Sequence, residues 1–167
     1  MRKQPRWKYF IEMTNFWMGK LGFSNPIEIR RDNRLDCPCA VITAEDWTKE
    51  AKITMAYNSR RLSREPIGVT LSNIFHEIGH LLERLPYDAK EEQIASEYAA
   101  ERFSVTMMKK HYPELFKEVI EHITKKRILY KYYKVARVYY EAYVRIPEYE
   151  KTMTKKDKEK IKKLQEA

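Results

Sequence analysis

Two histidines four residues apart, with a glutamate directly after the first, are the strongest chemical signal in this chain of 167 residues. His76, Glu77 and His80 form the pattern His-Glu-x-x-His. Side chains at positions i and i+4 lie on one face of a helix, so the two imidazoles can bind one metal ion. Glu77 would then lie beside a metal-bound water, where a carboxylate can act as a general base. The pattern therefore predicts a hydrolytic zinc site.

The residues around this pattern predict the helix that it needs. Apolar residues recur at helical spacing from Leu71 to Leu85, and Pro86 ends the segment. An amphipathic core helix with two ordinary histidines would show the same spacing, because it also buries one face. The carboxylate of Glu77 in the general-base position favours the metal site over that alternative.

A hydrolytic zinc site needs a third protein ligand and one open position for water. Glu97 and Glu101 frame the sequence Glu-x-x-Ala-Glu on a second predicted helix, which we expect Asp88 to open with a capping Glu91. Because the two glutamates share one helix face, Glu97 can bind the metal while Glu101 accepts a hydrogen bond from a ligand histidine. Ala100 keeps this face small. The alternative for Glu97 is a solvated helix glutamate, since the segment is rich in charge.

Together the two motifs resemble those of the gluzincins, zinc metallopeptidases with His-Glu-x-x-His followed by Glu-x-x-Ala and then Asp or Glu. The resemblance covers roughly residues 50–105 and lies closest to the single-domain minigluzincins and the ImmA/IrrE-type repressor-cleaving peptidases. In that family Asp is the commoner last residue of the second motif. The resemblance implies Zn²⁺ as the cofactor, with Glu77 as the general base, Glu101 as the support of a ligand histidine, and the zinc ligands His76, His80 and Glu97.

Two other zinc families share the first motif. A metzincin would continue to a glycine and a third histidine, but Glu83 and Pro86 occupy those positions. A peptide deformylase would place a cysteine ligand about 40 residues upstream, where Cys37 and Cys39 lie. The chain lacks the Glu-Gly-Cys-Leu-Ser context of that family and has only four glycines. A deformylase-like zinc amidohydrolase is therefore a minor alternative.

The segment Cys37-Pro38-Cys39 predicts two turn thiols, because a Cys-x-Cys spacing is too short for an easy disulfide. The alternative is a structural or inhibitory metal contact completed by His111 or His122. The chain has two cysteines and no apolar run near the ~20 residues of a membrane span. We therefore expect a cytoplasmic protein without a membrane partner.

The coarse pattern predicts an α+β fold. An N-terminal helix is expected from Pro5 to about Leu21, followed by short strands at 27–30, 40–43 and 52–57. The resemblance implies a compact zincin-like domain, in which a small mixed sheet precedes the active-site helix, the ligand helix and the C-terminal helices. In such a fold an edge strand flanks the cleft and binds an extended peptide, and the alternating run from Ile53 to Tyr57 is the candidate.

Positive charge is concentrated after the metal motifs. Residues 1–108 carry 16 Lys and Arg against 15 Asp and Glu, whereas residues 109–167 carry 17 against 9. We therefore expect three parts: a zincin-like metallopeptidase domain over 1–110, a helical extension over 111–150 packed on it, and a charged tail over 151–167.

The helical extension has seven tyrosines between positions 130 and 149, interleaved with basic residues. Such a mixture can bind nucleic acid through phosphate contacts and base stacking. Tyrosines at helical spacing more often pack their rings and leave the hydroxyl in water. We therefore expect a peptide or protein substrate as the partner rather than nucleic acid.

The predicted function is zinc-dependent hydrolysis of peptide bonds, with Glu77 as the base for the attacking water. The oxyanion needs a further donor, for which His111, His122 and the C-terminal tyrosines are candidates. The alternative is a non-catalytic zincin-fold regulatory protein that recognises nucleic acid or a DNA-bound repressor. An intact Glu77 argues against it, because a structural zinc site closes its fourth position.

Overall fold

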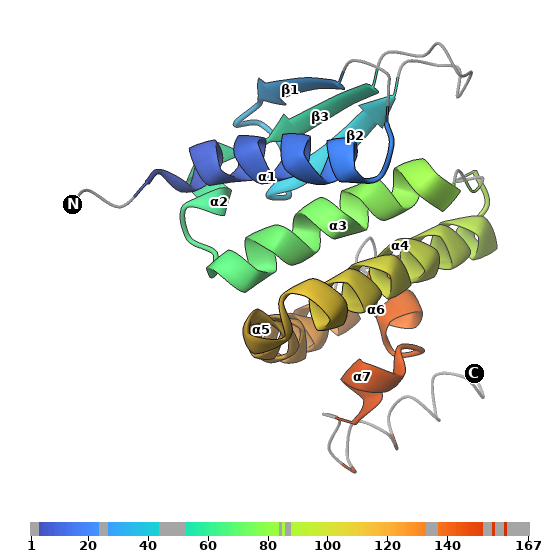
Figure 1. Cartoon of the computed structure of the whole chain (residues 1–167). Coiled ribbons are helices and arrows are strands. Elements are labelled where there is room, and N and C mark those ends of the chain that lie inside the picture. Colours follow the sequence, from blue (N-terminus) through green and yellow to red (C-terminus); the bar gives the residue numbers. More distant parts are fainter. Residues whose placement is uncertain are drawn as a thin grey trace.

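The computed structural model describes residues 4–23, 27–43, 53–83, 85, 88–132, 137–151, 155 and 159. These residues form an α+β fold, so the α+β part of the fold prediction is confirmed. Figure 1 shows a small sheet at one end of the molecule, α3 and α4 crossing the middle, and the C-terminal helices beyond them. In chain order the elements are α1 (Arg6–Lys20), β1 (Ile27–Arg31), β2 (Cys39–Thr43), β3 (Ile53–Tyr57), α2 (Ser59–Leu62), α3 (Ile67–Glu83), α4 (Lys90–His111), α5 (Pro113–Tyr132), α6 (Arg137–Tyr143) and α7 (Pro147–Glu150).

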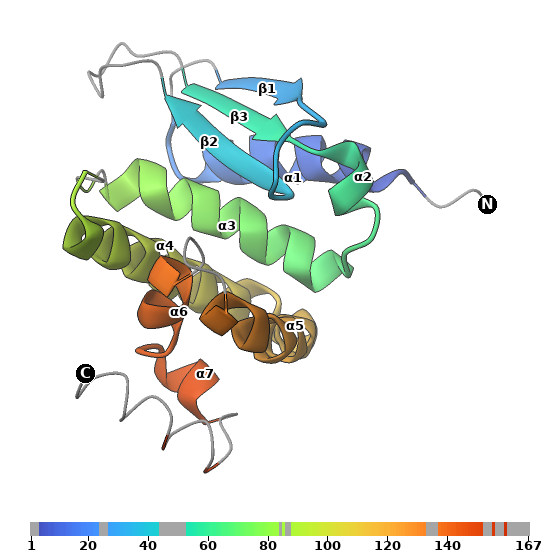
Figure 2. The ribbon, with the colours of Figure 1, turned by 180° about the vertical axis from the view of Figure 1, so that it is seen from behind.

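The three strands form one mixed sheet in the order β1-β3-β2. β3 pairs parallel with β1 and antiparallel with β2, so it is the central strand. The prediction that Ile53–Tyr57 is the edge strand beside the cleft is therefore wrong. Both neighbouring strands pair with its main chain, and its residues Met55, Ala56 and Tyr57 are all buried. The edge strand beside α3 is β2, as Figure 2 shows.

The core begins between the sheet, α1 and α3 and continues into the C-terminal helices. From α1, Phe10 packs its ring 5.5 Å from that of Tyr57, and Trp17 packs 5.0 Å from Phe75 on α3. Eleven of the 17 residues of α3 are buried, so this helix is covered on several sides. An amphipathic helix buried to this degree holds its side chains in fixed positions, which a metal site requires.

Glutamate side chains accept hydrogen bonds from main-chain N–H groups at the N-terminal ends of both central helices. At the start of α3, Glu118 accepts a hydrogen bond of 2.8 Å from the N–H of Gly68. Before α4, Glu92 accepts from the N–H groups of Asp88 and Ala89 at 3.1 and 2.9 Å. The capping residues thus lie one position later than predicted: Ala89 replaces Asp88 as the N-cap, and Glu92 replaces Glu91 in the expected capping role.

The C-terminal helices pack against the two central ones. α5 contacts α3 and α4, and α6 contacts α4 and α5. Within α5, Val119 and Ile123 are buried, as their helical spacing predicts. Most of the predicted tail over 151–167 lies outside the described residues. None of the helices in the described part of the chain combines the length and the apolar character needed to cross a membrane.

Candidate metal centre

Small residues allow α3 and α4 to approach closely. A Cβ atom added to Gly79 would lie 2.8 Å from the Cα atom of Ala100 and 2.9 Å from its carbonyl oxygen. Elsewhere along the same interface, the buried hydroxyls of Ser72 and Ser104 form a hydrogen bond between the two helices, with their oxygens 2.9 Å apart. This close packing brings the histidine face of α3 against the glutamate face of α4.

At this interface the structure brings together the three predicted metal ligands. The Nε2 atom of His76 lies 3.0 Å from Oε2 of Glu97 and 3.1 Å from Nε2 of His80. The Nε2 atom of His80 lies 3.6 Å from the other oxygen of Glu97. One ligand atom from each residue lies within 4.8 Å of the others, an arrangement that can hold a metal ion.

The donor set fits zinc. Two imidazole nitrogens and one carboxylate oxygen are the protein ligands of a hydrolytic site, which keeps a fourth position for water. Two nitrogens bound tetrahedrally at about 2.05 Å lie about 3.3 Å apart, close to the separation of the two imidazoles here. All three side chains are largely buried, which limits the ways in which they can rearrange.

Each of the two histidines has a hydrogen-bond partner on the nitrogen that points away from Glu97. The Nδ1 atom of His76 lies 2.8 Å from Oε2 of Glu101, and that of His80 lies 3.0 Å from the hydroxyl of Ser96. A carboxylate behind a histidine fixes the tautomer that presents Nε2 to the metal. The other oxygen of Glu101 accepts a short hydrogen bond from the hydroxyl of Tyr149. Glu101 therefore lies where its predicted supporting role places it.

Glu77 lies between the site and the sheet. Its Oε2 atom accepts a hydrogen bond of 2.8 Å from the N–H of Val41 on β2. Burial raises the pKa of Glu77, while His76 and His80 partly oppose that rise. A carboxylate whose pKa is raised above its usual range is a better proton acceptor near neutral pH. The geometry and the pKa both suit the general base that the sequence predicts.

The charges of the site favour an ionised carboxylate facing the two imidazoles. Burial by itself would raise the pKa of Glu97, but hydrogen bonds and charges from His76 and His80 outweigh it and hold that pKa well below its usual range. Burial lowers the pKa of His76, but Glu101 and Glu97 together outweigh it and raise that pKa well above its usual value. A metal ion must displace a proton from such a pair, so its affinity falls at acidic pH.

The cysteines are not members of the group that can hold a metal. Cys39 is buried in the core, Cys37 is exposed, and both thiols are free. Burial raises the pKa of the Cys39 thiol, and the charge of Glu77 raises it further. A thiol with a raised pKa is a poor metal ligand, because the ligand form is the thiolate. Within the described part of the chain, the group that can hold a metal contains Glu97 and no cysteine.

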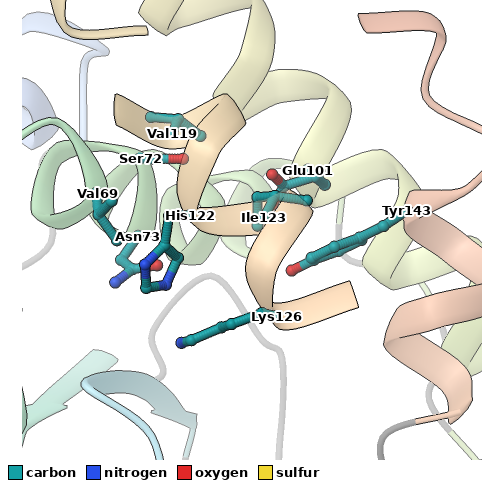
Figure 3. A pocket seen from close by; sticks show the side chains of 9 residues that line it. All are labelled: Val69, Ser72, Asn73, Glu101, Val119, His122, Ile123, Lys126 and Tyr143. Atoms are coloured by element: carbon teal, nitrogen blue, oxygen red, sulfur yellow. The ribbon is translucent and has the colours of Figure 1, made fainter. Parts of the chain in front are cut away.

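A small polar cavity of about 40 Å³ lies beside Glu101, between α3, α4, α5 and α6 (Figure 3). This volume has room for about two or three waters. Tyr143, whose ring centroid lies 6.3 Å from that of His76, points its hydroxyl toward the middle of the cavity. The residues that line it are Val69, Ser72, Asn73, Glu101, Val119, His122, Ile123, Lys126 and Tyr143.

The two histidines considered as oxyanion donors therefore lie elsewhere than in the ligand group. His122 lines the cavity of Figure 3. The ring of His111 lies 4.7 Å from that of Trp17, at the exposed end of α4. Among the C-terminal tyrosines, Tyr143 has its ring beside His76.

Three contacts of the site were not predicted from the sequence. They are made by the N–H of Val41, the hydroxyl of Ser96 and the hydroxyl of Tyr149. Val41 and Tyr149 are distant in sequence from the residues that they contact, so only the packing of the chain reveals them. Ser96 has a local signal, because it lies four residues before Ala100 and so shares the helix face that packs against α3.

No protein-family model matches this chain, and no curated protein or solved structure matches it significantly. The interpretation of the site therefore depends on its own residues and geometry.

Proposed function

We propose that this chain is a zinc-dependent metallopeptidase of the gluzincin type. The observation that carries the proposal is the convergence of His76, His80 and Glu97 on one point, with the carboxylate of Glu77 within electrostatic reach of all three. This is the donor set of a hydrolytic site, and a purely structural zinc site would have no use for a base at Glu77. A zincin-like fold is part of the same proposal, and the order of sheet, motif helix and ligand helix supports it.

The proposed chemistry assigns one role to each group. Zinc, when bound, supplies Lewis acidity for the scissile carbonyl and for water. His76, His80 and Glu97 hold the metal, and Glu101 keeps His76 in the tautomer that binds it. Glu77 accepts a proton from the attacking water and delivers it to the leaving amine.

The edge strand β2 supports a peptide as the substrate. The N–H of Asn58 donates to the carbonyl of Pro38, so these two residues are a hydrogen-bonded pair of the antiparallel ladder between β3 and β2. Along β2, residues that hydrogen-bond to β3 alternate with residues whose main-chain groups point away from it. The main-chain groups of Val41 therefore point away from β3, and its N–H reaches Glu77. An extended peptide that adds to this edge would run directly past the base.

The test is turnover of a mixture of quenched fluorescent peptides by zinc-loaded protein. Glu77→Gln should lower the rate by about 10²- to 10⁴-fold while leaving Zn²⁺ affinity within about two-fold, because the residue moves a proton and does not bind the metal. Glu83→Gln, an exposed glutamate at the end of the same helix, is the matched control and should change neither quantity. Unchanged turnover in Glu77→Gln would overturn the proposed mechanism.

A further inference from the structure

The one-turn helix α7 contacts the proposed metal site through Glu101, on the side away from the metal-binding atoms. Tyr149 is 1% exposed, and its hydroxyl donates a short hydrogen bond to Oε1 of Glu101. The second oxygen of Glu101 lies 2.8 Å from Nδ1 of His76. A continuous chain of hydrogen bonds therefore runs from the C-terminal part of the molecule, through one carboxylate, to a metal-facing imidazole.

A second set of contacts fixes α7 in place. Glu148 forms ion pairs with Arg102 and Lys109, both on α4, at 2.8 and 3.0 Å. The ring of Tyr149 also packs 6.1 Å from that of Tyr143 on α6. The hydroxyl of Tyr149 is thus held over Glu101 by the ion pairs on one side and by ring packing on the other.

We propose that Tyr149 is a positioning residue for the metal site, acting through Glu101. The terminal torsion of a glutamate is soft, so a carboxylate bound through one oxygen can rotate. The hydrogen bond from Tyr149 fixes one oxygen and so directs the other at His76. His76 in turn keeps Nε2 directed toward the metal. This inference depends on the proposed metal site and extends it to a residue 48 positions beyond Glu101.

The direct test is the affinity of the full chain for Zn²⁺, measured by competition with a chromophoric chelator. Tyr149→Phe keeps the buried ring and removes only the hydroxyl, so it should weaken Zn²⁺ binding about ten-fold. The absorption bands of the Co²⁺-loaded protein should also shift, because the orientation of a ligand imidazole changes. Tyr112→Phe is the control: its hydroxyl accepts from the indole of Trp17 at 3.2 Å, and it should leave both readouts unchanged.

A double-mutant cycle separates positioning from general stability. In a Glu101→Gln background, Tyr149→Phe should cause no further loss of Zn²⁺ affinity, because the two residues act in series. An equal loss in both backgrounds would overturn the inference, and so would a lowered melting temperature with unchanged Zn²⁺ affinity. If the Phe variant fails to fold, Glu148→Gln is the second variant: it loosens α7, keeps the hydroxyl, and should weaken binding about two-fold.

The failures of the two proposals are distinguishable. A wild-type chain that binds no Zn²⁺ would overturn the metal site and this inference with it. A wild-type chain that binds Zn²⁺ with an affinity that Tyr149→Phe does not change would overturn this inference alone.

Discussion

Two buried glutamates of this molecule have pKa values that are shifted in opposite directions. Glu97 on α4 is 2% exposed, and its pKa is held well below the usual range by the two imidazoles that face it, although burial opposes this. Glu65, just before α3, is 9% exposed. Burial raises its pKa to about 7, because Lys126 and a hydrogen bond of 2.8 Å from Asn73 only partly oppose the effect of burial. Burial is similar at the two positions, so the neighbouring cations decide which carboxylate stays charged.

The difference separates the proposed ligand from a structural carboxylate. The charged form of Glu97 is favoured by the two imidazoles that face it, and the three side chains form a group that could hold a metal ion. Glu65 changes its charge near neutral pH, where the folded protein resists the charged form. A buried glutamate alone is therefore a weak sign of function, whereas one that faces two imidazoles is a strong one.

The largest expected effect comes from removing the charge of Glu97. Glu97→Gln keeps the shape of the side chain but loses the anionic ligand, so Zn²⁺ affinity should fall by more than about 100-fold, beyond the range typical of supporting residues. Competition with a chelator measures it. Glu65→Gln is the matched control, because it makes the same change at the other buried glutamate, and it should bind Zn²⁺ as the wild type does. Full Zn²⁺ affinity in Glu97→Gln would show that Glu97 is not a metal ligand and that its low pKa does not distinguish it from Glu65 in function.

A second variant tests the helix packing that brings Glu97 to the histidines. Gly79→Ala places a methyl group against the backbone of Ala100, so it should lower the free energy of unfolding by about 2–3 kcal/mol. Gly19→Ala is the same substitution at a helical glycine where the added carbon meets no other part of the protein within 4 Å beyond its own helix turn, and it should stabilise by about 0.5–1 kcal/mol. Denaturant unfolding compares the two. Equal effects would show that α3 and α4 do not need their close approach.

The third variant sharpens the comparison at Glu65. Its folded pKa of about 7 lies above the unfolded value, so the folded state binds more protons and stability falls as pH rises from about 4.5 to 7. Glu65→Gln removes this penalty while keeping an acceptor for Asn73, so it should stabilise the protein at pH 8 by about 2 kcal/mol and by little at pH 4.5. Unfolding curves at the two pH values measure the difference. A variant with no gain at pH 8 would show that Glu65 is adequately compensated.

Local spacing in the sequence predicted much of the site. The i, i+4 relation placed His76 with His80 and Glu97 with Glu101, because helix geometry alone fixes which side chains share a face. The small residue Ala100 between the two glutamates signalled the close helix approach that Gly79 completes. The α+β class was also predictable, since helices and strands differ in period.

What the sequence did not reveal depends on contacts between distant segments. An alternating run such as Ile53–Tyr57 identifies a strand but not its place in the sheet, and pairing on both sides made it central. The start of α4 was misjudged because Glu91 and Glu92 are adjacent and either can cap the helix. The contacts of Val41 with Glu77 and of Tyr149 with Glu101 join segments 36 and 48 residues apart. No local pattern encodes such pairs.

The central claim is that two histidines and a carboxylate bind zinc and leave a position for water. X-ray absorption at the zinc edge of the loaded full chain tests it most directly, because it identifies the ligand atoms. Our account predicts one zinc per chain with two imidazole nitrogens and oxygen ligands at about 2.0–2.2 Å. A sulfur ligand at about 2.3 Å would contradict it and favour a cysteine-ligated site, and a chain that binds no zinc would contradict it outright.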